Sequence, residues 1–152
     1  MSRITVKEFL ETDIPRLYAG DPILKIAETF ANCPYNFLPV YDTQNNFRGL
    51  VTIDSLINAF TPSYLALFPR LDLIPDFGIL EGEFLTLSTS LFVAEDLIDH
   101  EILRVDENDS LLKAVVQMIQ EKCDQLPVFS RDNFVGIIRK NSLAKAVVSR
   151  SR

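Results

Sequence analysis

The chain of 152 residues has no tryptophan, a single histidine and only two cysteines. One histidine, His100, is too few for a histidine-based metal site, and Cys33 and Cys123 lack metal-ligand spacing. The acidic residues do not follow the spacing of a calcium loop either. Two isolated cysteines favour reduced thiols and a cytoplasmic protein. We therefore expect no metal and no bound cofactor.

Long apolar runs and excess positive charge are also missing. No apolar stretch approaches the ~20 residues of a membrane span, and the first ten residues lack the apolar centre of a secretory signal. The formal net charge of −6 disfavours nucleic acid, which binds to faces rich in lysine and arginine. We expect neither a membrane nor a nucleic acid as partner.

No catalytic constellation is present. No nucleophile has a candidate base or oxyanion donor at a spacing that would place them together. Asp76-Phe77-Gly78 spells the magnesium-binding tripeptide of protein kinases, but no glycine-rich loop or catalytic-loop aspartate accompanies it. The sequence predicts a protein that is not an enzyme.

What the sequence does contain is an internal duplication. Residues 14–42 align with residues 102–130 at an offset of 88, and residues 46–60 align with residues 133–147 at an offset of 87. The single deletion falls in a polar turn, where chains tolerate length changes. The identical pairs include Ile14/Ile102, Arg16/Arg104, Asp21/Asp109, Lys25/Lys113, Leu38/Leu126, Pro39/Pro127, Val40/Val128, Gly49/Gly136 and Ser55/Ser142.

Both copies predict the same elements in the order β-α-β-β-α. Apolar residues at helical spacing and alternating apolar runs separated by polar turns indicate them. We expect Asp21 to cap the first helix, with Pro22 at its first position, and Asp54 and Asn141 to cap the last helix of each copy. The expected strands are 37–41 and 47–52 in the first copy and 126–129 and 134–138 in the second, with short helices at 6–10 and 94–98 and extended segments at 14–17 and 102–105.

The duplication predicts three parts: a first repeat at 1–60, an insert at 61–92 and a second repeat at 93–152. The insert is rich in leucine and phenylalanine, so its apolar side chains need cover. It either packs over one face of its own module or provides an interface to another chain.

Two strings in the sequence resemble CBS motifs. Leu38-Pro39-Val40-Tyr41-Asp42 precedes Gly49-Leu50-Val51-Thr52-Ile53-Asp54-Ser55-Leu56, and Leu126-Pro127-Val128-Phe129 precedes Gly136-Ile137-Ile138-Arg139-Lys140-Asn141-Ser142-Leu143. The resemblance implies a tandem CBS pair, or Bateman module, of the α+β class. Its two pseudo-symmetric repeats would form one compact module with two clefts between them. Such clefts hold adenosine compounds: AMP, ADP, ATP or S-adenosylmethionine.

The resemblance also points to candidate ligand-binding residues. They are Thr52, Asp54 and Ser55 at the strand-to-helix junction of the first copy and Arg139 and Ser142 at that of the second, together with Gly49 and Gly136, which end a turn and start a strand. The family pattern places an aspartate on the ribose, but Ser55 and Ser142 stand in that position here. Arg139 replaces the usual threonine and suits a phosphate.

We therefore expect a non-catalytic regulatory module that senses an adenosine compound and acts on a separate, unknown effector protein. The alternative is a ligand-free scaffold for protein–protein contacts. We also expect a homodimer, because several apolar side chains need cover beyond the core of each copy. They are Leu56, Ile57, Phe60, Leu97, Leu143, Ala144 and Val147.

Overall fold

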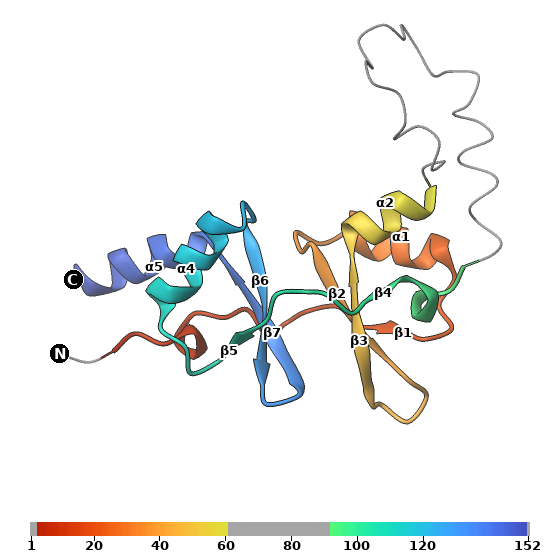
Figure 1. The fold of residues 1–152 in the computed structure, drawn as a ribbon, viewed down its shortest axis with the longest axis horizontal. Coiled ribbons are helices and arrows are strands. Elements are labelled where there is room, and N and C mark those ends of the chain that lie inside the picture. The colour runs from red at the N-terminus through yellow and green to blue at the C-terminus, as the bar shows by residue number, and fades with distance from the viewer. Residues whose placement is uncertain (1–2, 61–91, 152) are drawn as a thin grey trace, which may run out of the picture. The chain divides into compact units, whose positions relative to one another are not determined.

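The computed structural model describes residues 3–60 and 92–151 (Figure 1). The chain divides into two units, one of residues Arg16–His100 and one that combines Met1–Pro15 with Glu101–Arg152. Each unit therefore contains one copy of the repeat together with the segment that precedes the other copy. We call these the leading segments: residues 3–15 precede the first copy, and residues 92–100 precede the second. The insert expected at 61–92 lies, except for Phe92, outside the described residues.

The unit of the first copy, called here the first unit, has in its described residues a four-stranded sheet and the α-helices α1 and α2. Its strands have the order β1-β2-β3-β4, with β1 parallel to β2 and the other pairs antiparallel. The elements in chain order are β1 (Leu17–Tyr18), α1 (Ile23–Ala31), β2 (Phe37–Tyr41), β3 (Phe47–Thr52), α2 (Ile53–Phe60), the 3-10 helix η4 (Ala94–Leu97) and β4 (Ile98–Asp99).

The second unit repeats this plan. Its sheet has the order β5-β6-β7, with β5 parallel to β6 and β7 antiparallel to β6. In place of β4, Glu11 of the leading segment forms an antiparallel bridge with Ile137 of β7. The elements are the 3-10 helix η1 (Val6–Glu8), β5 (Val105–Asp106), α4 (Leu111–Gln120), β6 (Gln125–Ser130), β7 (Asn133–Arg139) and α5 (Asn141–Arg150). The predicted order β-α-β-β-α is confirmed in both copies.

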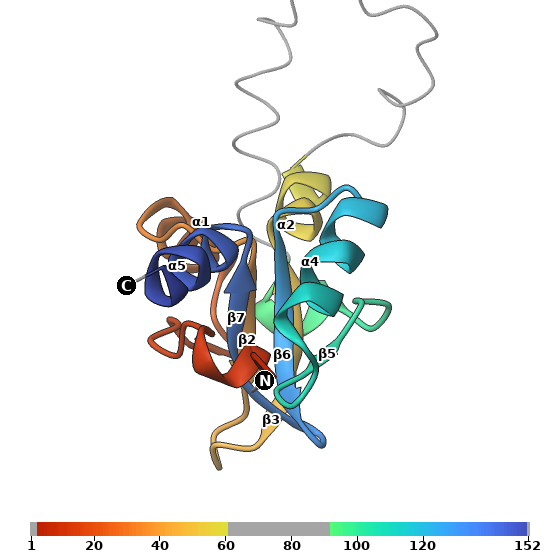
Figure 2. The ribbon, with the colours of Figure 1, turned by 90° about the vertical axis from the view of Figure 1, so that its left-hand side faces the viewer.

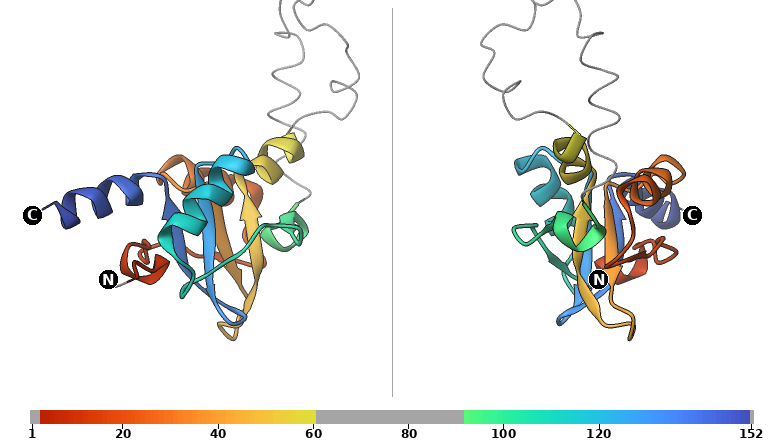
Figure 3. Two further views of the ribbon diagram at one scale, coloured as in Figure 1. Left: turned by 60° about the vertical axis from the view of Figure 1, so that its left-hand side comes forward. Right: turned by 90° about the vertical axis from the view of Figure 1, so that its right-hand side faces the viewer.

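The cores follow from the apolar pattern of the two copies. Leu38 and Val40 on β2 are fully inaccessible to solvent, and their equivalents on β6, Leu126 and Val128, are buried as well. Apolar residues three or four positions apart place one face of each following helix against these strands. On α1 these are Ile23, Ile26 and Phe30, and on α4 they are Leu111, Ala114, Val115 and Met118. In the second unit α4 contacts β6, and α5 contacts β7 and α4 (Figures 2 and 3).

The repeated aspartate and lysine have a structural reason. Asp21 Oδ2 accepts a hydrogen bond of 2.8 Å from the backbone N–H of Tyr18, and its other oxygen lies 3.4 Å from Lys25 Nζ. Asp109 repeats both contacts in the second copy, at 3.2 Å and 3.5 Å. The prediction that Asp21 caps α1 is wrong, because Pro22 is the N-cap residue and Asp21 closes the turn before it.

The repeated arginine also has a packing role. The guanidinium carbon of Arg16 lies 4.2 Å from the ring centroid of Tyr41, and that of Arg104 lies 3.7 Å from the ring centroid of Phe129. A cation over an aromatic face at this distance is attracted by the ring quadrupole. The contact ties the extended segment before each helix to the central strand of its sheet.

Two of the seven apolar residues expected at an interface belong to the core of the first unit instead. Leu56 is only 5% exposed and Leu97 only 8% exposed. Leu56 lies on the inner face of α2, and Leu97 ends η4, which packs on β3. Ile57, Leu143 and Val147 do face solvent. Among the described residues, no helix is long and apolar enough to cross a bilayer.

Candidate functional site

The two strand-to-helix junctions, β3–α2 and β7–α5, hold the candidate ligand-binding residues. At the offset of 87, Thr52 corresponds to Arg139 and Ser55 to Ser142. Both copies reach this point through an antiparallel strand pair with a register shift, after Val40 in the first copy and after Val128 in the second. The side chains at the two junctions therefore decide any difference in chemistry.

At the first junction two hydroxyl groups face one another. Thr52 Oγ1 lies 2.9 Å from Ser55 Oγ and accepts a hydrogen bond of 3.0 Å from the backbone N–H of Ser55. Thr52 thus caps α2, and the prediction that Asp54 caps it is wrong. Asp54 lies in the first turn of the helix with an exposed side chain. Both hydroxyls are half-buried and lie at the N-terminus of α2.

At the second junction an ion pair takes the place of the hydroxyl pair. Arg139 Nε and Nη2 donate to the two carboxylate oxygens of Glu11, at 2.5 Å and 2.8 Å. Both side chains are 23% exposed. Two parallel N–H···O bonds are the geometry in which a guanidinium binds carboxylate or phosphate most strongly. The guanidinium expected to meet a ligand phosphate is therefore bound to the chain's own carboxylate.

The second serine is also engaged by the leading segment. Ser142 is 2% exposed, and its hydroxyl donates to the backbone carbonyl of Phe9 at 3.3 Å. Asn141 does not cap α5, because Lys140 is the N-cap residue and its side chain makes no capping bond. Buried under its own chain, Ser142 presents no free hydroxyl surface to a ligand.

The two candidate glycines make room for the leading segments. A Cβ on Gly136 would lie 2.3 Å from the backbone oxygen of Glu11 and 2.4 Å from Leu10 Cδ1. A Cβ on Gly49 would lie 2.5 Å from Cγ2 of Ile98, the residue equivalent to Leu10. Gly49 also has a φ of 154°, which L-residues rarely adopt. Each glycine thus permits a close approach of the chain itself at the edge of its sheet.

Sequence reasoning missed Glu11, the residue that decides the state of Arg139. The signal was present in the repeat, because Glu11 corresponds to Asp99 at the offset of 88 and an acid therefore leads both copies. The sequence alone could not predict that the leading segment of the first copy lies beside the β7–α5 junction of the second copy.

Beyond the two junctions, the described residues include two cysteines and several acidic side chains. Burial raises the pKa of the Cys123 thiol, which keeps it protonated and a poor nucleophile near neutral pH. Both cysteines are free thiols. Among residues 3–60 and 92–151, no group of three histidine, cysteine, aspartate or glutamate side chains is placed to hold a metal ion.

The repeated junctions are those of a known family. A family model described as CBS domain matches the chain twice, over residues 6–61 and 93–149. The chain belongs to the CBS domain family. Both matches contain a strand-to-helix junction, so the CBS pair includes the hydroxyl pair of Thr52 and Ser55 and the ion pair of Arg139.

Several solved structures share the fold of this chain at low sequence identity. CBSX2 in complex with AMP has a TM-score of 0.66 and 19% identity, with 98% of this chain and 99% of that chain covered. A putative acetoin utilization protein from Vibrio cholerae has a TM-score of 0.67 and 16% identity, with coverage of 97% and 93%. A hypothetical conserved protein from Geobacillus kaustophilus has a TM-score of 0.64 and 22% identity, with coverage of 98% and 99%. No curated protein matches the sequence.

Proposed function

We propose that this CBS pair is a non-catalytic regulatory module that binds an adenosine compound, AMP, ADP, ATP or S-adenosylmethionine, at the β3–α2 junction. The observation that carries the proposal is the pair of hydroxyls, Thr52 and Ser55, 2.9 Å apart at the start of α2. Occupancy of the junction then alters contacts to an effector protein.

The chemistry of the first junction suits a nucleoside. A hydroxyl both donates and accepts, so two adjacent hydroxyls can exchange hydrogen bonds with the two hydroxyls of a ribose. The N-terminus of α2 carries a positive partial charge that favours a phosphate beside it. That CBSX2, which shares the fold, has been solved with AMP supports an adenosine compound as the ligand.

We expect the affinity to be weak. The family pattern has an aspartate where Ser55 stands, and a carboxylate that accepts ribose hydroxyls contributes about 1.5–3 kcal/mol per charge-assisted bond. Its replacement by a neutral hydroxyl corresponds to a dissociation constant roughly 10 to 150 times larger. Binding in the micromolar range or weaker follows.

Calorimetric titration with AMP, ATP and S-adenosylmethionine tests the proposal. Ser55→Ala removes one ribose partner but leaves the backbone N–H of residue 55 on Thr52, so α2 stays capped. We expect this variant to lose most of the binding heat while its melting temperature stays close to that of the original protein. Thr52→Ser, which keeps the hydroxyl, should retain binding.

The matched control is Thr29→Ala on α1. Its hydroxyl donates to the Lys25 carbonyl at 2.8 Å on an exposed surface of α1, whereas Ser55 lies on α2. It should bind like the original protein. No heat with any of the three compounds at millimolar concentration would reject the sensing function and leave the ligand-free scaffold in its place.

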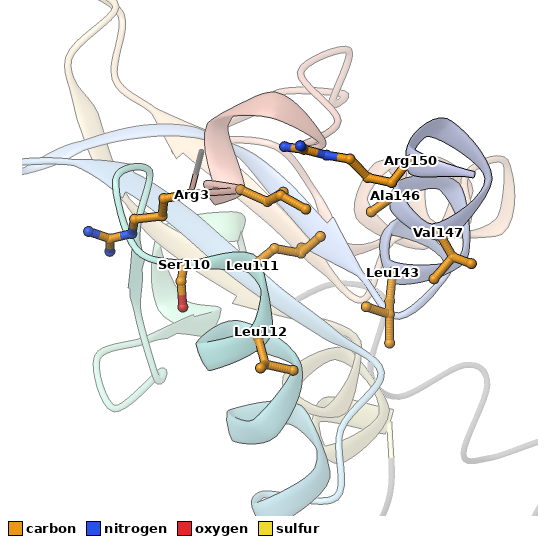
Figure 4. A pocket seen from close by; sticks show the side chains of 9 residues that line it. Arg3, Ser110, Leu111, Leu112, Leu143, Ala146, Val147 and Arg150 are labelled. Atoms are coloured by element: carbon orange, nitrogen blue, oxygen red, sulfur yellow. The ribbon is translucent and has the colours of Figure 1, made fainter. Parts of the chain in front are cut away.

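We further propose that the module is a homodimer that uses the helices of the second unit. Its α4 and α5 expose apolar side chains that a soluble monomer would leave in water, with Leu112 65%, Val147 62% and Ile119 61% exposed. Between these helices lies an apolar groove of about 480 Å³ (Figure 4). Arg3, Ile4, Ser110, Leu111, Leu112, Leu143, Ala146, Val147 and Arg150 line it. A second copy would bury this surface in a symmetric contact.

Light scattering tests the dimer. We expect the original protein to have twice the monomer mass of 17.2 kDa, and Leu112→Asp to have the monomer mass because it places a charge in the apolar face. The control is Leu103→Asp, on the segment before β5, where an exposed leucine belongs to neither helix. A monomer mass for the original protein at all micromolar concentrations would contradict the proposal.

A further inference from the structure

We propose that the Glu11 carboxylate is an internal competitor at an anion-binding position of the β7–α5 junction, and that a phosphate group reaches Arg139 only by displacing it. The inference extends the proposed function, on which it rests for its biological ligand, by assigning the second junction to phosphate. The device is an autoinhibitory contact within the second unit.

The geometry of the ion pair is that of an occupied anion site. Two N–H groups of Arg139 point at two oxygens of one carboxylate, at 2.5 Å and 2.8 Å. A guanidinium presents the same fork to two oxygens of a phosphate. Glu11 therefore occupies the position that a phosphate would take.

The carboxylate can leave without moving the chain. The Glu11 backbone donates to the Ile137 carbonyl at 2.8 Å and accepts from the Ile137 N–H at 2.9 Å. The backbone oxygen of Glu11 also packs directly over Gly136. These contacts are made by the backbone of the leading segment, so they do not depend on the Glu11 carboxylate.

The position is accessible and electrostatically suited to an anion. With 23% of each side chain exposed, Arg139 and Glu11 are in contact with solvent. The helix α5 begins two residues after Arg139 and runs for ten residues, and the N-terminus of such a helix carries a positive partial charge. Removal of the Glu11 charge would leave a site of net positive potential in an otherwise acidic protein.

The equivalent position in the first copy cannot work in this way. Thr52 stands where Arg139 stands and carries no charge. The two junctions of one chain thus have different chemistry: a hydroxyl pair for a ribose in the first unit and a guarded guanidinium for a phosphate in the second.

Titration with inorganic pyrophosphate at low ionic strength tests the inference. Pyrophosphate has neither adenine nor ribose, so it tests the phosphate contact alone, and only binding that depends on Arg139 is assigned to the second junction. We expect Glu11→Gln to bind pyrophosphate about tenfold more tightly than the original protein, the size of effect given by one charge-assisted contact. The double variant Glu11→Gln with Arg139→Gln should lose the gain.

Two controls separate local geometry from net charge and from unfolding. Glu8→Gln removes the same charge from the same segment, where Glu8 Oε2 only accepts from the Thr5 N–H at 2.8 Å, and it should not gain affinity. Glu11→Asp keeps the charge but withdraws the carboxylate by one methylene, and it should gain part of the affinity.

Equal pyrophosphate affinity in Glu11→Gln and the original protein, with both folded by melting temperature, would overturn the inference. So would an equal gain in Glu8→Gln, or a gain that survives Arg139→Gln. These outcomes are independent of the AMP titration, which tests the first junction.

Discussion

The two units of this CBS pair share the order of their elements and several backbone contacts, and they differ in the side chains at their strand-to-helix junctions. In both units a backbone N–H of the leading segment donates to the carbonyl of the repeated aspartate before the first helix. In the second unit Val6 donates to Asp109, and in the first unit Ala94 donates to Asp21. Glycine admits the leading segment to the sheet edge in both. The comparison teaches that the same fold accepts a threonine at position 52 and an arginine at the equivalent position 139. In the second unit Glu11 of the leading segment supplies the negative charge that pairs with the arginine. The two junctions therefore differ in side-chain chemistry although the order of the elements is the same.

The largest expected effect is on the two glycines. Gly136→Ala should lower the free energy of unfolding by about 3 kcal/mol, because the new methyl group collides with a backbone oxygen that has nowhere to move. Gly49→Ala should cost about 2 kcal/mol, because its principal collision is with the Ile98 side chain. Urea denaturation measures both values.

A second substitution sharpens this contrast. Adding Ile98→Ala should recover part of the loss in Gly49→Ala, whereas adding Leu10→Ala should recover little in Gly136→Ala, since the Glu11 carbonyl remains. Equal recovery in the two units would show that the close approaches are equivalent after all.

The next effect concerns the two arginine–glutamate pairs. In a double-mutant cycle with alanine, the bidentate and mostly buried pair of Arg139 and Glu11 should show a coupling of about 1–2 kcal/mol. The matched control is Arg48 with Glu95 in the first unit, whose side chains are 49% and 43% exposed. Solvent screens that pair, so we expect less than about 0.5 kcal/mol. A coupling of the same size in both cycles would contradict the interpretation of Glu11 as a specific partner.

A smaller effect distinguishes the ends of α1 and α4. Lys122 follows α4 with a φ of 55°, and the N–H of Cys123 bonds to the Met118 carbonyl at 2.9 Å, as in a Schellman motif. Lys122→Gly should raise the free energy of unfolding by about 0.5–1 kcal/mol, because glycine adopts this conformation without strain. The equivalent residue in the first copy is Pro34, so Pro34→Gly should not stabilise the protein. Thermal denaturation of both variants makes the comparison.

The smallest effect is a pH dependence confined to the first unit. The backbone N–H groups of Asn46 and Gln44 donate to the Asp42 carboxylate. These hydrogen bonds, that of Asn46 more than that of Gln44, hold the pKa of Asp42 below its usual value. A carboxyl with a lowered pKa in the folded state stabilises the protein above its unfolded pKa, and that contribution is lost as the pH falls through the folded pKa. Asp42→Ser, which copies Ser130 of the second turn, should therefore flatten the loss of stability at acid pH. Melting temperatures between neutral pH and pH 3 test this, and an unchanged acid slope would show that the turn does not contribute.

The repeat made most of the fold predictable. Because the two copies align, each strand and helix could be predicted from two sequences. The strands at 37–41 and 47–52 were predicted with the bounds that the structure shows. Local hydrogen bonding was less predictable. Asp21, Asp54 and Asn141 all suit an N-cap by residue type, but Pro22, Thr52 and Lys140 occupy those positions because the cap is decided by where the backbone leaves the preceding strand or turn.

The sequence by itself determined the family, the order of elements and which residues stand at the two junctions, because these depend on local pattern and on the offset between the copies. Only the tertiary structure decided what those junction residues contact. The leading segment of each copy packs on the strand of the other, so Glu11 meets Arg139 and Phe9 covers Ser142 across more than 120 positions of the chain. Contacts between residues so far apart in sequence produce no local periodic pattern, so the sequence alone does not predict them. They arise from the pairing of an edge strand, which any extended segment of suitable length could supply.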